Sequence, residues 1–185
     1  YLIDRMDNTR LVLHHPRDEG PVIRFDNPWE FPFAGCPTLI KDGAKYRLYY
    51  RGMFGTGDGT NVECTCYAES DDGIHWTKPN LGLFEVKGTR ENNCVWANDP
   101  PFSHDFSPFL DTRPGVDPAQ RFKAVAGIKK SGGLWAFASA DGIHWKKLYG
   151  KPIITDGAFD SHNVAFWSEH EGKYLCYFRT WKGYR

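Results

Sequence analysis

Short segments in which apolar and polar residues alternate recur along the chain, and turn signals separate them. A period of two residues is typical of strands that bury one face. Asp42-Gly43 and Glu171-Gly172 each lie between two such segments, which predicts a hairpin at both places. No segment longer than a turn or two has helical periodicity. The pattern predicts an all-β protein, with strands over the ranges 36–40, 45–51, 64–69, 107–110, 121–127, 134–138, 164–167 and 173–179.

Two nearly identical heptapeptides divide the chain into repeats. Residues 70–76 read Ser-Asp-Asp-Gly-Ile-His-Trp and residues 139–145 read Ser-Ala-Asp-Gly-Ile-His-Trp, an offset of 69 residues (145 − 76). The repeated unit is strand, turn, strand, loop, strand, Asp-Gly turn and strand, and four antiparallel strands per repeat are typical of a β-propeller blade. We expect one partial propeller domain over 1–185, with about two and a half blades. Its parts are a lead-in (1–32), two blades (33–101 and 102–156) and a partial blade (157–185).

Each residue type in the heptapeptide has a structural interpretation. The Asp-Gly turn needs positive φ at its glycine, the isoleucine is expected to enter the next strand, and the tryptophan is expected to pack between blades. His75 and His144 are interpreted as turn or strand-surface residues, because equivalent positions in successive blades lie too far apart to share a metal ion. The lead-in is expected to supply one more strand from residues 1–30.

Composition excludes several classes of partner. The 23 basic and 23 acidic side chains cancel and form no basic stripe, which argues against a nucleic-acid partner. No apolar run approaches the roughly 20 residues that a membrane-spanning helix needs. Both ends read as if cut from a longer protein, so we expect further blades, and we expect residues 1–185 alone to be inactive. The termini leave the localisation open, with secretion or export to the periplasm as one option.

The five cysteines have irregular spacing and form neither a disulfide framework nor a zinc motif. We interpret them as small strand residues and predict no metal ion or cofactor. Cys64 and Cys66 are two residues apart and share one face of their strand. A redox pair or a metal site at these two residues is the alternative.

The Asp-Gly-Ile-His-Trp turns, the hairpins of the Asp-Gly-Lys-Tyr type and the segment Phe159-Asp160-Ser161-His162-Asn163-Val164 resemble the five-bladed β-propeller glycosidases. This superfamily includes arabinanases, β-xylosidases, invertases and levansucrases, and mannoside phosphorylases are relatives. The resemblance extends over nearly the whole chain as a repeat pattern. It implies five blades in the complete ring and carboxylates at the start of the innermost strands, facing a central funnel.

The resemblance implies three candidate catalytic carboxylates. Asp160 matches the central Asp of the superfamily, and Asp105 begins the second inner strand. In the first inner strand Cys36 precedes Pro37, where a family enzyme commonly has Asp, so the nearest acid, Glu30, is the third candidate. A further Glu is expected from a blade beyond the chain. For each of these acids, a capping, turn or surface role is the alternative.

Candidate substrate-binding residues surround these acids. Imidazole and amide groups can bond sugar hydroxyls, and indole rings can stack on the apolar faces of sugars. The candidates are His104, His162, Asn163, Trp29 and Trp96. Asp99 is a weaker catalytic candidate, while Arg51 and Arg179 are interpreted as structural cations packed on aromatic rings.

The leading functional hypothesis is a glycoside hydrolase that cleaves a poly- or oligosaccharide with paired carboxylates. A glycan-binding propeller without catalysis is the first alternative, because Cys36 replaces an expected Asp. A glycoside phosphorylase is the second alternative, and it would need a cluster of cations beside the acid to hold phosphate. A protein-binding scaffold is the least favoured. The expected partner is a carbohydrate, and the oligomeric state is left open.

Overall fold

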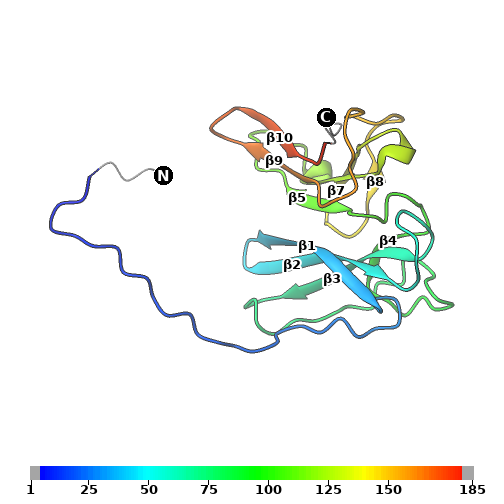
Figure 1. Ribbon diagram of the computed structural model, residues 1–185, viewed down its shortest axis with the longest axis horizontal. Coiled ribbons are helices and arrows are strands. Elements are labelled where there is room, and N and C mark those ends of the chain that lie inside the picture. Colours follow the sequence, from blue (N-terminus) through cyan, green and yellow to red (C-terminus); the bar gives the residue numbers. More distant parts are fainter. Residues whose placement is uncertain (1–4, 181–185) are drawn as a thin grey trace, which may run out of the picture.

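The computed structural model describes residues 5–180 and consists of antiparallel sheets with two short 3₁₀ helices (Figure 1). The first sheet has the order β1-β2-β3-β4, with β1 (Phe33–Asp42), β2 (Lys45–Met53), β3 (Glu63–Ser70) and β4 (Cys94–Ala97). The second sheet has the order β5-β6-β7-β8, with β5 (Ser107–Leu110), β6 (Phe122–Ala126), β7 (Trp135–Ser139) and β8 (Lys146–Lys147). The third pairs β9 (Val164–Ser168) with β10 (Lys173–Tyr177). The 3₁₀ helices are η1 (Pro118–Gln120) and η2 (Lys129–Ser131). The expected all-β fold with four-stranded antiparallel sheets is confirmed.

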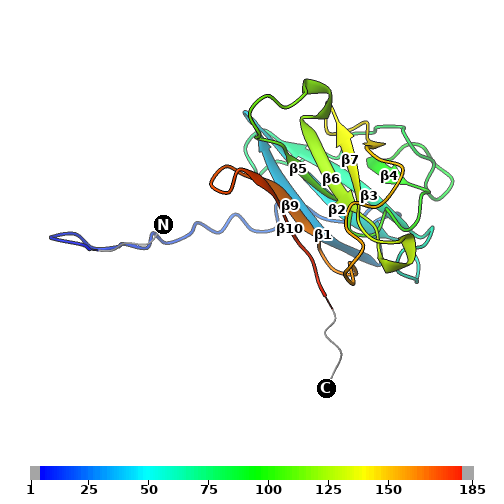
Figure 2. The same ribbon diagram turned by 90° about the horizontal axis from the view of Figure 1, so that it is seen from above.

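The first strand of each sheet lies next to the first strand of the following sheet. β1 contacts β5 and β5 contacts β9, and Figure 2 shows the three sheets side by side. In the strand register, Thr38 pairs with Tyr49, Ser107 with Val125, and Val164 with Tyr177. Thr38, Ser107 and Val164 thus occupy equivalent positions in the first strands of the three sheets. Residues just before them share one end of the three adjacent strands.

The two heptapeptides form the same turn. In the first, Ser70 Oγ accepts hydrogen bonds from the backbone N–H groups of Asp72 and Gly73, at 3.2 and 2.8 Å. Asp72 Oδ1 accepts from the N–H groups of Ile74 and His75, and His75 Nδ1 lies 2.6 Å from Asp72 Oδ2. The second heptapeptide repeats each of these contacts. The histidines are therefore turn residues, as expected.

Two expectations about strands are wrong. Neither isoleucine enters a strand. Ile143 lies before β8, which begins at Lys146, and after the first turn only Thr77 bridges back to Glu69, while the fourth strand of this sheet begins at Cys94. Pro79 explains the break, because a proline has no N–H with which to continue the pairing. The described part of the lead-in, residues 5–32, contains no strand and forms an extended arm (Figure 1). Four prolines in the arm, at positions 16, 21, 28 and 32, remove donors that a strand would need.

Aromatic side chains fill the interface between the first two sheets. Tyr49, Tyr67 and Phe122 are fully buried there. The Trp145 ring meets Tyr49 edge-on at 6.3 Å and Phe106 at 5.2 Å, so this tryptophan packs between sheets as expected. Trp76 packs instead on the other face of the first sheet. Among the described residues, no helix has the length and apolar character required to cross a membrane.

Candidate active site

Charged side chains gather at the end of the first sheet where β1 starts, β2 ends and β3 starts. Antiparallel pairing brings these three strand ends together. Cys36 lies on β1, Arg51 on β2 and Glu63 at the start of β3, and His104 and Asp105 come just before β5. We call these five residues the inner-strand cluster. The backbone at Cys36 and Asp105 has positive φ, 50° and 48°. Such conformations are rare outside glycine and are enriched at functional sites.

Hydrogen bonds and ion pairs connect the members of the inner-strand cluster. His104 Nδ1 lies 2.9 Å from Glu63 Oε1 and 2.7 Å from Arg51 Nη1. This nitrogen can therefore accept from Arg51 when the imidazole is neutral and donate to Glu63 when it is protonated. Asp105 lies 3.7 Å from Arg51 and 3.6 Å from His104 Nε2. Glu63, His104 and Asp105 are buried, so their charges interact strongly.

The surroundings shift the pKa values of two members of the cluster. Burial alone would lower the pKa of His104, but the hydrogen bond and charge of Glu63, together with the charge of Asp105, outweigh burial and raise it. Burial also raises the pKa of the Cys36 thiol to about 12, with a further contribution from its hydrogen bond to Asp105. Cys36 therefore remains a neutral thiol at neutral pH, and it is poorly suited to act as a nucleophile.

Asp160 shares a pocket with His104. Arg179 Nε donates to Asp160 Oδ1 at 2.8 Å, and its Nη2 pairs with the other oxygen. This two-point pairing with Arg179 lowers the pKa of Asp160. The pocket has a volume of about 290 Å³, and its lining consists of Asp58, His104, Ile128, Lys129, Lys130, Ala158 and Asp160. The structure thus brings Asp160 and the edge of the inner-strand cluster together.

His162 and Asn163 lie between the same inner strands. His162 Nε2 is 3.3 Å from Thr38 Oγ1, beside a cavity of about 310 Å³ between the first strands of the three sheets. Asn163 is fully buried, and its side-chain amide donates to the carbonyl of Phe159 at 3.3 Å. The Asn163 Oδ1 atom has no hydrogen-bond partner among the described residues. A buried acceptor without a partner can accept a hydrogen bond from a bound hydroxyl or water.

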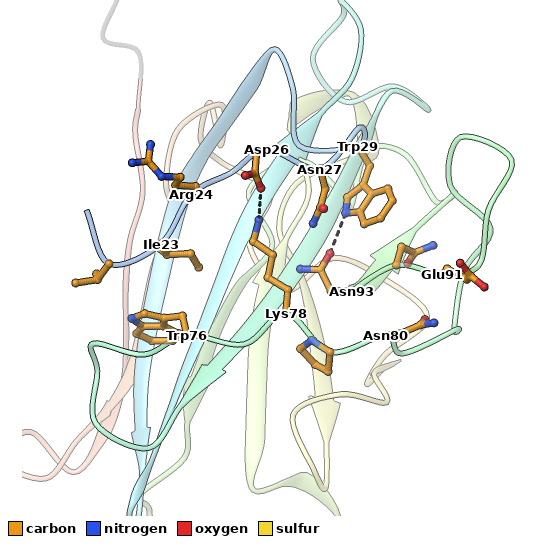
Figure 3. Close-up of a pocket in the computed structure, with 13 residues that line it drawn as sticks. Ile23, Arg24, Asp26, Asn27, Trp29, Trp76, Lys78, Asn80, Glu91 and Asn93 are labelled. Carbon is orange, nitrogen blue, oxygen red and sulfur yellow. Dashed lines mark hydrogen bonds and ion pairs between the residues drawn. The ribbon is translucent and has the colours of Figure 1, made fainter. Parts of the chain in front are cut away.

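Glu30 and Trp29 lie elsewhere. Both Glu30 oxygens are engaged: Tyr50 donates to Oε1 at 2.5 Å, and Lys78 donates to Oε2 at 2.7 Å. Trp29 Nε1 donates to Asn93 Oδ1 at 2.8 Å, beside a separate pocket of about 400 Å³ between the arm and the first sheet (Figure 3). The structure does not bring Glu30 and Trp29 together with Asp105 and Asp160. Their contacts fit the structural alternative.

Trp96 and Asp99 also have structural contacts. The Trp96 ring stacks on Phe106 at 5.7 Å and meets Phe137 edge-on at 5.1 Å, so this half-buried residue packs against the core. Asp99 forms an ion pair with Lys147 at 2.9 Å. Arg51 does pack on an aromatic ring as expected, with its guanidinium carbon 5.0 Å from the centre of the Phe33 ring.

Sequence reasoning missed Glu63 and the two lysines of the Asp160 pocket. Glu63 could have been found from topology, because the start of a third antiparallel strand lies at the same sheet end as the start of the first. Lys129 and Lys130 lie on η2, a short turn with no periodic signal. They reach the pocket only through the packing of neighbouring sheets.

Two groups of described side chains could hold a metal ion. Asp58, Glu63 and His104 each place one ligand atom within 4.8 Å of the others, but Glu63 Oε1 already contacts His104 Nδ1 at 2.9 Å and Glu63 Oε2 accepts from the Gly59 N–H. The second group is Cys64, Cys66 and Cys94, on the other face of the first sheet.

Comparison with curated proteins finds relatives that are longer than this chain. No family model matches the chain. The uncharacterized protein Rv1502 of Mycobacterium tuberculosis (strain H37Rv) is 28% identical over 160 residues, which are 85% of this chain and 46% of that protein. The chain thus spans about half the length of the curated relatives that it matches.

Solved structures also match the chain. A glycosyl hydrolase from Bacteroides ovatus matches with a TM-score of 0.50 and 19% identity, over 85% of this chain and 46% of that chain. A fructofuranosidase from Schwanniomyces occidentalis complexed with fructose matches with a TM-score of 0.48 and 18% identity, over 76% of this chain and 28% of that chain. At these identities the comparison shows a likeness of fold, which for the Bacteroides ovatus glycosyl hydrolase extends over 85% of this chain.

Proposed function

We propose that the chain belongs to a glycoside hydrolase that cleaves a poly- or oligosaccharide, with Asp160 and Asp105 as its paired carboxylates. The observation that carries the proposal is the common pocket of Asp160 and His104, beside Asp105, at one end of the adjacent first strands. The likeness of the fold to a glycosyl hydrolase supports it. Closure of the complete protein into a five-bladed ring, with a funnel at this end, belongs to the same proposal.

The charges suggest how the two carboxylates divide the work. Cleavage of a glycosidic bond needs one carboxylic acid to protonate the leaving oxygen and one carboxylate to attack or to activate water. The ion pair with Arg179 favours the ionised form of Asp160, which suits the carboxylate that attacks or activates water. Proton donation is therefore assigned to Asp105, which is buried beside Cys36 and His104. His162 lines the cavity between the first strands, and Asn163 Oδ1 is a buried acceptor without a partner among the described residues. Both side chains are assigned the role of binding sugar hydroxyls.

A glycoside phosphorylase is the second candidate, because the Asp160 pocket contains cations. Lys129, Lys130 and His104 line the same pocket as the carboxylate. Phosphate binding requires positive charge of this kind next to the acid. In this case phosphate takes the place of the attacking water, and the product is a sugar phosphate.

The test measures turnover of oligosaccharides with and without inorganic phosphate, for the complete protein and for its variants Asp160→Asn and Asp105→Asn. Positioned acid–base groups contribute about 10²- to 10⁴-fold, so each variant is expected to lose at least about 10²-fold in kcat. The matched control is Asp156→Asn, an exposed aspartate outside the pocket, which is expected to keep its activity.

The possible results separate the hypotheses. Turnover that requires phosphate identifies the phosphorylase, and turnover without phosphate identifies the hydrolase. Glycan binding without turnover by the unaltered protein would point to a binding propeller, the alternative that Cys36 raises. Turnover that is unaffected by both substitutions would overturn the assignment of the site.

A further inference from the structure

Three cysteines meet in the core of the first sheet, on the face away from the second sheet. Cys64 and Cys66 lie on β3 and Cys94 lies on β4, and none of the three has exposed surface. The sulfur atoms of Cys64 and Cys66 are 3.6 Å apart, and all three sulfurs lie within 4.8 Å of one another. We call these residues the cysteine triad.

Strand geometry assembles the triad. Cys64 and Cys66 are two residues apart on one strand and so share a face. Cys94 pairs directly with Cys66 in the β3–β4 register, at a local irregularity of the ladder. Chain segments far apart in the sequence thus bring three soft ligand atoms to one point.

The spacing of the sulfurs fits a metal ion at the centre of the triad. Metal–thiolate bonds of about 2.3 Å in a trigonal plane would place the sulfurs about 4.0 Å apart. The observed separations, from 3.6 Å to at most 4.8 Å, bracket this value. Only small shifts of the side chains are needed to reach trigonal geometry.

Gly52 on β2 keeps the space beside the triad open. A Cβ atom at this position would lie 3.1 Å from Cys66 Sγ, 3.2 Å from Cys64 Sγ and 2.6 Å from the Trp29 carbonyl oxygen. Any side chain there would press on two of the three sulfurs. The glycine is therefore required by the packing around the triad.

We propose that the cysteine triad is a binding site for a soft d¹⁰ metal ion in three-coordinate thiolate geometry, with copper(I) as the best match. Thiolates select soft ions such as copper(I) and zinc. Structural zinc is almost always four-coordinate. The Trp29 carbonyl oxygen lies 3.8 Å from Cys64 Sγ, and no imidazole nitrogen or carboxylate of the described residues belongs to the cluster.

Binding is an exchange of protons for the metal ion. Each S–H proton still present is released to solvent and one S–Cu bond forms per cysteine, while the copper remains monovalent.

The experiment is an anaerobic titration of the reduced, purified protein with copper(I) in competition with bicinchoninate. We expect one copper(I) per chain, a thiolate-to-copper charge-transfer band and, by X-ray absorption, three sulfur neighbours. Cys94→Ala is expected to weaken binding at least about 100-fold, in line with the loss of one of three ligands. The matched controls Cys36→Ala and Cys176→Ala remove the two cysteines outside the triad and should bind as the unaltered protein does.

Several outcomes would overturn the proposal. They are no competition with the chelator, copper surrounded by nitrogen or oxygen, and equal weakening by Cys176→Ala. A fourth is a Cys66–Cys94 disulfide that forms in air and persists under mild reductant, because it would identify the pair as a structural cross-link. The X-ray absorption of the unaltered protein decides the question even if Cys94→Ala fails to fold.

Discussion

At the level of single residues, the chemistry of the candidate site depends on the charged partner that holds each acid or base. Asp160 is paired at two points by Arg179, whereas His104 lies between Arg51 and Glu63. These partners shift the two pKa values in opposite directions, because the pKa of Asp160 is lowered and that of His104 is raised. One pocket thus contains a carboxylate that stays ionised and an imidazole that holds its proton more readily.

Removal of Arg179 should move the acid limb of the pH–activity profile. In Arg179→Gln the pKa of Asp160 returns upward toward its usual value, so Asp160 becomes protonated at a higher pH as the solution is acidified. The acid limb of kcat/KM is expected to shift to higher pH. The control is Arg24→Gln, an exposed arginine on the arm, which should leave the profile unchanged. An unchanged profile in Arg179→Gln would contradict the role assigned to Asp160.

At the level of elements, polar contacts across the buried interface orient the first two sheets. The Tyr49 hydroxyl donates to the Gly142 carbonyl at 3.0 Å, and Arg47 donates to the Asp141 carbonyl at 2.9 Å. Asp42 accepts from both Arg47 and Arg121. The second Asp-Gly turn is therefore anchored on strands of the preceding sheet, which orients β1 relative to β5 and so positions the cavity beside His162 that lies between them.

Tyr49→Phe is expected to weaken this interface. The substitution keeps the ring but leaves the Gly142 carbonyl without its buried donor, which typically costs about 1–2 kcal/mol of unfolding free energy. Urea denaturation measures the change. Tyr46→Phe is the matched control on the same strand, because the described structure gives its hydroxyl no hydrogen bond, and its loss should be near zero. Equal losses in the two variants would refute the role of the Tyr49 hydroxyl.

At the level of the whole molecule, the third sheet is the least enclosed of the three sheets. It has two strands, and Val164, Phe166, Tyr174 and Tyr177 are exposed on them. Its polar link to the second sheet runs through the Tyr174 hydroxyl, which donates to Asp111 Oδ2 at 2.7 Å. A two-stranded sheet is marginally stable by itself, so this link matters more than its single hydrogen bond suggests.

Amide hydrogen exchange should be faster in the third sheet than in the first two sheets. Amides of β10 are expected to exchange at least about tenfold faster than those of the central strands β2 and β6, because local opening of a two-stranded sheet exposes little buried surface. Mass spectrometry of peptides covering these strands measures the difference. Protection of β10 equal to that of β2 would show that the third sheet opens only with the whole domain.

The strand pattern was largely readable before the structure. Alternation predicted β5 and β9 closely, and the Asp42-Gly43 hairpin appears where it was expected. The expected strands at Ile74 and in the lead-in failed, because prolines in those segments remove donors that pairing needs. Of the candidate carboxylates, Asp105 and Asp160 lie at the predicted end of the inner strands, while Glu30 is bound by Tyr50 and Lys78 elsewhere.

The sequence by itself determined the local elements, because turn chemistry and side-chain alternation depend on residues that are neighbours in the chain. The tertiary structure alone decided which side chains meet, since register and sheet packing join residues from distant segments. Glu63 reaches His104 through the shared ends of strands, and Cys94 reaches Cys66 through the pairing of β3 with β4. The Asp160 pocket and the cysteine triad are therefore properties of the fold.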